Sequence, residues 1–170
     1  MRIVFLDVDG VLNCAFTKET YQGFIGADHS LVENLSIFLN KSNEEEETKI
    51  VLSSSWRIGQ DRNGADIPDS YNYLSGKLAE YGLTIYDDTP RIPWSRGQSR
   101  RGREIAGWFY MNRNLDIRGY VVLDDVLFED FERYKILPHF VRTTFFSQSG
   151  GFRESYINKA MEIIRLPFTW

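Results

Sequence analysis

The sequence has few of the residues that build disulfide frameworks or zinc sites. Its 170 residues include one cysteine, Cys14, and two histidines, His29 and His139. A lone cysteine cannot form an internal disulfide, and two dispersed histidines are too few for a zinc site, so we expect surface or packing roles for both histidines. The chain fits a reducing compartment, and we predict a cytoplasmic protein.

Long apolar runs and a targeting leader are also missing from the sequence. No stretch approaches the roughly 18 apolar residues of a membrane span. The chain starts with an apolar strand pattern instead of a basic, apolar and small-residue leader. There is no internal repeat, low-complexity linker, P-loop or Gly-rich dinucleotide fingerprint. We expect no membrane association and no stable protein partner.

Neither sign of charge is strongly in excess. The 20 Lys and Arg against 24 Asp and Glu give a formal net charge of -4. This charge gives no overall attraction to nucleic acid or to anionic membranes, although it does not exclude a local basic site. A hydrophobic content of 42% and a charged content of 26% are ordinary for a soluble globular protein. The length fits one domain over residues 1–170 with a substantial core.

The stretch around which the rest is organised is an apolar run that ends in two carboxylates. Ile3-Val4-Phe5-Leu6 is followed by Asp7-Val8-Asp9-Gly10. An apolar run without a polar break is typical of a strand buried on both faces of a parallel sheet. Ligands bind at the carboxyl edge of such sheets, so Asp7 and Asp9 are expected where chemistry occurs. Gly10 allows a sharp turn there.

Asp7 and Asp9 point to similar sides if the strand geometry persists, and their repulsion calls for a cation or a shared proton. Carboxylate oxygens favour Mg²⁺ or another hard cation, so both are candidate metal ligands. A calcium-binding loop is excluded, because Val11 stands at a ligand offset, Leu12 at that of the required Gly and Lys18 at that of the closing Glu. An Asp-Gly turn at a strand end is the alternative without chemistry.

The segment Asp7-Val8-Asp9-Gly10-Val11-Leu12 resembles the signature of the haloacid dehalogenase-like (HAD) phosphohydrolases. In that family an apolar strand runs into Asp-x-Asp-Gly and then Val/Thr-Leu. The resemblance implies that Asp7 is the phosphoryl-accepting nucleophile and that Asp9 is the general acid and base.

A second apolar strand, residues 49–52, ends in a run of three hydroxyl side chains: Ser53, Ser54 and Ser55. Hydroxyls at a strand's carboxyl end can donate to a phosphate oxygen, and the alternative is a Ser-rich turn that caps a helix. The resemblance implies that one of them hydrogen-bonds the transferred phosphoryl group. The strand and the following Trp56 favour Ser54, with Ser53 close behind.

Four arginines, Arg96, Arg100, Arg101 and Arg103, lie within eight residues, next to a predicted helix. A catalyst that gathers a phosphate dianion and several Asp needs a fixed positive charge beside them. A basic surface patch is the alternative. The family uses a Lys, less often an Arg, just before or within the helix that precedes its fourth strand. Arg101 fits that place best, and Arg103 is the other candidate.

The run Gly119-Tyr120-Val121-Val122-Leu123 repeats the opening pattern, since it leads into Asp124 and Asp125. Adjacent carboxylates at the end of a buried strand are explained if they help to hold a cation that Asp7 also coordinates. An acidic turn without a metal is the alternative. The family's fourth motif is such an acidic pair, so the resemblance implies that Asp124 is an Mg²⁺ ligand and that Asp125 assists it.

The remaining patterns predict alternating helices and strands. Ser30-Leu31-Val32-Glu33 has the form of a capping box at the start of a helix over about 28–41. Further helices are marked by Leu74, Leu78 and Tyr81 before Gly82, by Ile105, Trp108 and Phe109, and by Ile157, Ala160, Met161 and Ile164; short strands are expected at 83–86 and 140–142. We therefore predict a three-layer, Rossmann-like, doubly wound parallel sheet of the HAD-like class. Residues 13–26 are expected to form a loop or small flap over the site, and the cap domain to be small or absent.

These motifs predict an Mg²⁺-dependent phosphomonoester hydrolase that acts through an aspartyl phosphate. Trp56, Trp94 and the arginine-rich segment favour a nucleotide or a nucleic-acid end as substrate, because aromatic rings stack on bases and arginine binds phosphates. The Ser-Ser-Trp arrangement resembles HAD domains of nucleic-acid repair phosphatases. A phosphorylated small metabolite, such as a sugar phosphate, is the rival substrate, and a non-catalytic phosphate-binding module is the rival class.

Overall fold

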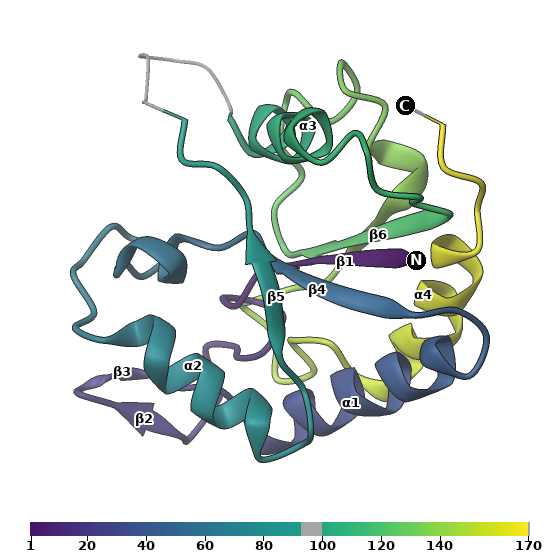
Figure 1. Cartoon of the computed structure of the whole chain (residues 1–170). Coiled ribbons are helices and arrows are strands. Elements are labelled where there is room, and N and C mark those ends of the chain that lie inside the picture. The colour runs from purple at the N-terminus through teal and green to yellow at the C-terminus, as the bar shows by residue number, and fades with distance from the viewer. Residues whose placement is uncertain (93–99, 170) are drawn as a thin grey trace.

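The computed structural model describes residues 1–92 and 100–169, and its centre is a five-stranded parallel sheet (Figure 1). The strands stand in the order β5-β4-β1-β6-β7. Their bounds are Arg2–Leu6 for β1, Thr48–Leu52 for β4, Ile85–Asp88 for β5, Gly119–Asp124 for β6 and Phe140–Arg142 for β7. The predicted parallel α/β sheet is therefore confirmed.

The register brings the ends of the three central strands level. Leu6 of β1 pairs with Leu52 of β4 on one side and with Leu123 of β6 on the other. The pairing continues past the strand ends, since the Asp7 N–H donates to the Leu123 carbonyl and the Ser53 N–H to the Leu6 carbonyl. The residues that follow the three strands thus emerge side by side at one edge, as parallel pairing requires.

The strands of the sheet alternate between two buried faces. Ile3 and Phe5 of β1 belong to one apolar cluster, and Val4 and Leu6 belong to the other. This is the period of two that strand geometry imposes, and both faces need cover because every one of these side chains is fully buried.

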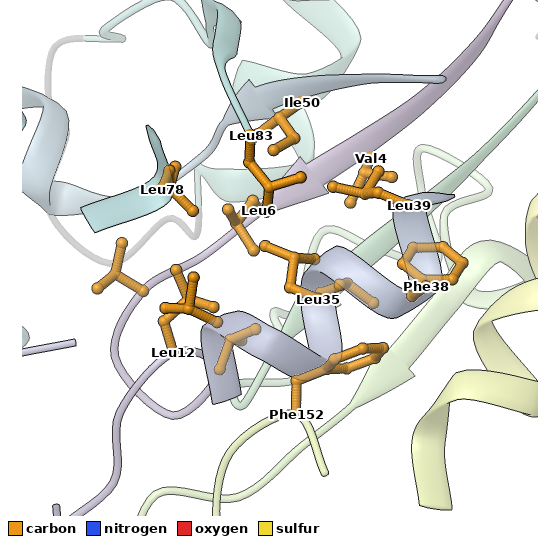
Figure 2. Close-up of a cluster of buried hydrophobic side chains, with 14 of the residues drawn as sticks. Val4, Leu6, Leu12, Leu35, Phe38, Leu39, Ile50, Leu78, Leu83 and Phe152 are labelled. Atoms are coloured by element: carbon orange, nitrogen blue, oxygen red, sulfur yellow. The ribbon is translucent and has the colours of Figure 1, made fainter. Parts of the chain in front are cut away.

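Helices form the outer two layers. The α3 helix (Arg101–Met111) covers the face of the sheet that carries Phe5 (Figure 1). Three helices contribute to the cluster on the other face: α1 (His29–Asn43), α2 (Ser70–Ala79) and α4 (Ile157–Ile164). Figure 2 shows that second cluster, in which Leu35 and Phe38 of α1 lie beneath Val4 and Leu6. The predicted three-layer arrangement is confirmed.

The first helix begins differently from its prediction. Its N-cap is Asp28, whose carboxylate accepts hydrogen bonds from the backbone N–H groups of Ser30 and Leu31. The Ser30 hydroxyl donates to the same carboxylate instead of capping the helix itself. The predicted capping box at Ser30–Glu33 is wrong, because a carboxylate two residues earlier satisfies the free N–H groups of the first turn.

Two short features departed from the sequence pattern. The edge strand β5 starts at Ile85, two residues after its predicted start, because its register against β4 pairs Ile85 with Ile50 and Asp88 with Leu52. Within residues 13–26, β2, Thr20–Tyr21, and β3, Phe24–Ile25, form a small antiparallel hairpin. The stacked rings of Tyr21 and Tyr73 connect this hairpin to α2.

Three short 3-10 helices complete the elements of residues 1–92 and 100–169: η1 at Ser55–Ile58, η2 at Leu137–His139 and η3 at Glu154–Tyr156. In the part of the chain that the structure describes, none of the helices combines the length and apolar character needed to cross a bilayer.

Candidate active site

The site begins where β1 delivers Asp7 and Asp9 to the sheet edge. Both carboxylates are largely buried, each with 7% of the residue surface exposed. The chain then turns through Gly10, whose φ of 83° suits glycine, and a Cβ there would come within 2.4 Å of the Asp125 side chain. The Thr143 hydroxyl donates to the Gly10 carbonyl at 2.5 Å, so the turn is also tied to the segment after β7.

Two neutral side chains hold the Asp9 carboxylate. Asn13 Nδ2 donates to Asp9 Oδ1, and Trp56 Nε1 donates to Asp9 Oδ2, each at 3.0 Å. Burial, and after it the neighbouring Asp7, raise the pKa of Asp9 to about 6, although these two hydrogen bonds act in the opposite direction. Asp9 is therefore oriented in place and holds a proton more readily than an ordinary aspartate.

Asp7 also belongs to a group of three converging carboxylates. Carboxylate oxygens of Asp7, Asp124 and Asp125 lie within 4.8 Å of one another. Burial raises the pKa of all three, and the charge of Asp7 adds to the effect at Asp124. Asp124 Oδ2 is fully buried and accepts no hydrogen bond within the described part of the chain. Acid groups packed in this way suit a hard divalent cation.

Asp9 was also predicted to be a metal ligand, but its carboxylate is not in this group of three. Both of its oxygens are engaged by Asn13 and Trp56 instead. The geometry thus separates the acids into three converging carboxylates that could hold a cation and the single carboxyl group of Asp9, which hydrogen bonds orient.

Arg101, the first residue of α3, provides the positive charge. Its guanidinium lies 3.6 Å from Asp7 Oδ1 and 3.4 Å from Asp124 Oδ2. Burial acts to lower the pKa of Arg101, but Asp124 and Asp7 outweigh it and the pKa lies above its usual value. Arg103, the other candidate, is exposed, and its backbone N–H donates to Asp130. The structure places Arg101 beside the acids.

The three predicted serines take different positions. Ser53 Oγ accepts a hydrogen bond from Arg101 at 3.2 Å, and a side-chain hydrogen bond from Ser54 favours the charged form of Asp7. Both residues are buried at the edge between β4 and α3. The Ser55 hydroxyl donates to the carbonyl of Asp61, so it is turned towards the following loop.

Sequence reasoning missed several residues that build this site. Arg57 forms a buried ion pair with Glu104 at 2.9 Å, and Arg62 pairs with Asp125 at 3.2 Å. Only the position of Arg57, directly after the serines and Trp56, gave a hint of its role. Arg62 lies in a polar loop whose pattern carried no signal. Trp94 and Arg96, which were predicted near the substrate, lie outside the described residues.

A comparison with protein families gives one match that covers most of the chain. The model described as "HAD domain in Swiss Army Knife RNA repair proteins" matches residues 3–154. The match spans the acids of β1, the serines after β4, Arg101 and the acids of β6. Searches of curated proteins and of solved structures return no match for this sequence.

Proposed function

We propose that this chain, which belongs to the family of HAD domains in Swiss Army Knife RNA repair proteins, hydrolyses phosphomonoesters with Mg²⁺ through an aspartyl phosphate on Asp7. Membership of this family implies phosphohydrolase activity. The observation that carries the proposal is the meeting of Asp7, Arg101 and Asp124 at one buried edge of the sheet. A nucleophile, a fixed cation and a cation-suited acid group are what phosphoryl transfer to a carboxylate requires.

In the first step Asp7 attacks the phosphorus in line, and the bond between phosphorus and the leaving oxygen breaks. Asp9 gives its proton to that oxygen, so the alcohol leaves neutral. In the second step Asp9 takes a proton from water, whose oxygen attacks the phosphorus and frees Asp7 and inorganic phosphate. The pKa of Asp9, raised to about 6, supports the acid role, because the group must be protonated at the start.

Arg101 and Ser54 serve the transferred group in this reaction. The Arg101 side chain is 12% exposed and already oriented by Asp7 and Asp124, so it would need little reorganisation to face the equatorial phosphoryl oxygens. The Ser54 hydroxyl is adjacent to Asp7 and is the donor we assign to one of these oxygens.

Asp7, Asp124 and Asp125 are the residues we assign to Mg²⁺. HAD proteins generally use this ion, and these three carboxylates fit it because their oxygens converge and one buried oxygen of Asp124 has no hydrogen-bond donor among the described residues. When bound, the ion would supply positive charge against the phosphoryl oxygens.

For the substrate we propose a nucleic-acid end or a nucleotide. The family description places such domains in RNA repair proteins, which supports this class. A phosphorylated small metabolite, such as a sugar phosphate, is the competing substrate. A non-catalytic phosphate-binding module is disfavoured, because phosphate binding alone does not need the oriented carboxyl group of Asp9 beside Asp7.

The direct test is a phosphatase assay on a generic phosphomonoester with and without Mg²⁺. We expect turnover that needs Mg²⁺ and that Asp7→Asn abolishes without a change in the melting temperature. Steady-state activity retained by pure Asp7→Asn protein would refute the nucleophile. Activity of the wild type that is the same in excess chelator would refute the metal assignment.

A substrate panel then separates the substrate classes. Oligonucleotides with a terminal phosphate, mononucleotides and sugar phosphates are compared by kcat/KM in Mg²⁺. A preference for the nucleotide substrates supports the proposal, and a preference for sugar phosphates contradicts its substrate class.

A further inference from the structure

A small cavity opens beside Asp9, and none of the three acids assigned to the metal is among its lining residues. Its volume is about 210 Å³, and its walls include Phe24 of the hairpin, Trp56, and Phe145 and Phe146 from the segment after β7. Arg62 lies on the same wall. Ligand pockets for drug-sized molecules are usually about 300–1,000 Å³, so this cavity suits one small ring system. Its lining combines four aromatic side chains with aliphatic, polar and charged ones.

The position of Asp9 tells which part of a substrate can enter the cavity, provided that the proposed function holds. Asp9 gives its proton to the leaving oxygen, so the group attached to that oxygen must lie on the Asp9 side of the phosphorus. The cavity is on that side, since Asp9 forms part of its wall. It is therefore a pocket for the leaving group and not for the phosphate.

Arg62 and two phenylalanines form a flat, cationic wall of this pocket. The Arg62 guanidinium carbon lies 3.9 Å from the ring centroid of Phe145 and 5.1 Å from that of Phe146. Arg62 is also fixed by its ion pair with Asp125. Arginine stacked on aromatic rings offers a planar surface on which a nucleobase can stack.

Phe146 is the most informative member of this wall. It is 80% exposed, the highest value among the large apolar side chains of the described residues. A single exposed phenylalanine is ordinary on a protein surface, but this one lies on the wall of the cavity, where a bound ligand would cover it. Beyond the wall, a second hollow of about 640 Å³ shares Arg62, Phe145 and Phe146 and is also lined by Arg142. A nucleic-acid strand would thus have room to continue past the first nucleotide.

We infer that the cavity beside Asp9 binds the nucleobase of the nucleotide whose sugar carries the phosphate, and that Phe146 and Arg62 determine this specificity. The shared chemistry is a purine or pyrimidine attached to the leaving group, either in a mononucleotide or at the end of a nucleic acid. A phosphomonoester of a small aliphatic alcohol has no ring to place in the cavity.

The test compares three substrates with the full chain in Mg²⁺: a mononucleotide, an oligonucleotide with a terminal phosphate, and glycerol phosphate. For Phe146→Ala we expect the ratio of kcat/KM for a nucleotide substrate to that for glycerol phosphate to fall about tenfold, in line with the contribution of base stacking. Phe146→Tyr, which keeps a ring, should retain most of the ratio. The mononucleotide and the oligonucleotide are compared separately to identify the source of the base. If the kcat/KM ratio falls for one of the two substrates alone, the pocket is assigned to that substrate.

Tyr110→Ala is the matched control. Tyr110 is 71% exposed and has Arg113 5.3 Å from its ring centroid, but it lies on α3 and is not part of the cavity wall. This variant should leave the ratio unchanged.

Two failures can be told apart. If the wild type hydrolyses glycerol phosphate with Mg²⁺ but Phe146→Ala leaves both nucleotide ratios unchanged, the base pocket is wrong and the proposed function stands. If the wild type hydrolyses none of the three substrates, the proposed function is contradicted and the pocket inference falls with it.

Discussion

Trp56 is one of the two residues whose side chains donate hydrogen bonds to the Asp9 carboxylate. Its indole N–H donates to Asp9 Oδ2 at 3.0 Å, and its side chain is buried. Nothing in the sequence connects residues 9 and 56, because the contact exists only after β1 and β4 pair. The local pattern predicted the acids and the serines, whereas the residue that orients one of the acids came from the tertiary structure.

We predict that Trp56→Phe lowers kcat on glycerol phosphate about tenfold with little change in KM, because an acid that is no longer oriented loses part of its catalytic contribution. Trp108→Phe is the matched control. Trp108 belongs to the other apolar cluster, is equally buried, and donates its indole N–H to the Asp87 carboxylate at 2.7 Å. Steady-state kinetics of both variants check the prediction. Equal losses of kcat in the two variants would mean a general packing effect.

At the scale of elements, the buried pair of Arg57 and Glu104 joins the turn after β4 to α3. Both side chains are 5% exposed, and Arg57 also donates to the carbonyls of Ser54 and Thr89. This pair fixes the helix that carries Arg101 next to the strand end that carries Ser54. The sequence showed an arginine-rich segment, but it did not show that Glu104 of α3 accepts a hydrogen bond from an arginine in the turn after β4.

Removing Glu104 should leave a buried guanidinium without its partner. We predict that Glu104→Ala lowers the free energy of unfolding by about 3–5 kcal/mol. The exposed pair of Lys77 and Glu80, joined at 3.0 Å, is the control, and Glu80→Ala should cost about 0–1 kcal/mol. Urea unfolding of both variants measures the difference. A cost for Glu104→Ala no larger than that for Glu80→Ala would refute the anchoring role.

The accuracy of the sequence prediction also varied between elements for physical reasons. The apolar runs of β1, β4 and β6 were predicted well, since a strand buried on both faces must be apolar throughout. The hairpin of β2 and β3 was not resolved, because each strand has two residues and its turn uses Gln22, with φ of 49°, before Gly23. Asn or Asp before glycine is the usual signal for such a turn.

At the scale of the whole molecule, His139 links the pH of the solution to folding. It is 4% exposed, its Nδ1 lies 3.1 Å from the Tyr120 carbonyl oxygen, and its ring stacks on the ring of Tyr120. Burial lowers the pKa of His139 below its ordinary value. The sequence correctly predicted packing as one of two roles for this histidine, but only the fold shows that it packs against β6.

Because the folded protein binds the proton of His139 less readily than the unfolded chain, His139 favours folding above the unfolded pKa of about 6.5. This contribution to stability is lost as the pH falls from the pKa of His139 in the unfolded chain through its lower pKa in the folded protein. We predict that His139→Phe, which keeps a ring for stacking, reduces the loss of stability between neutral and mildly acidic pH. Urea unfolding of wild type and variant at both pH values measures the difference, and equal pH dependence in the two proteins would contradict it.

If Asp7 accepts the phosphoryl group, the aspartyl phosphate can be trapped on it. Asp9→Asn protein is incubated with Mg²⁺ and acetyl phosphate, whose acetate leaving group needs no acid, and the acid-quenched protein is digested for mass spectrometry. We expect one added phosphoryl group on Asp7, absent without Mg²⁺ and absent from Asp7→Asn/Asp9→Asn. A wild type that hydrolyses acetyl phosphate, together with an Asp9→Asn protein that carries no phosphoryl group on Asp7, would rule out Asp7 as the nucleophile.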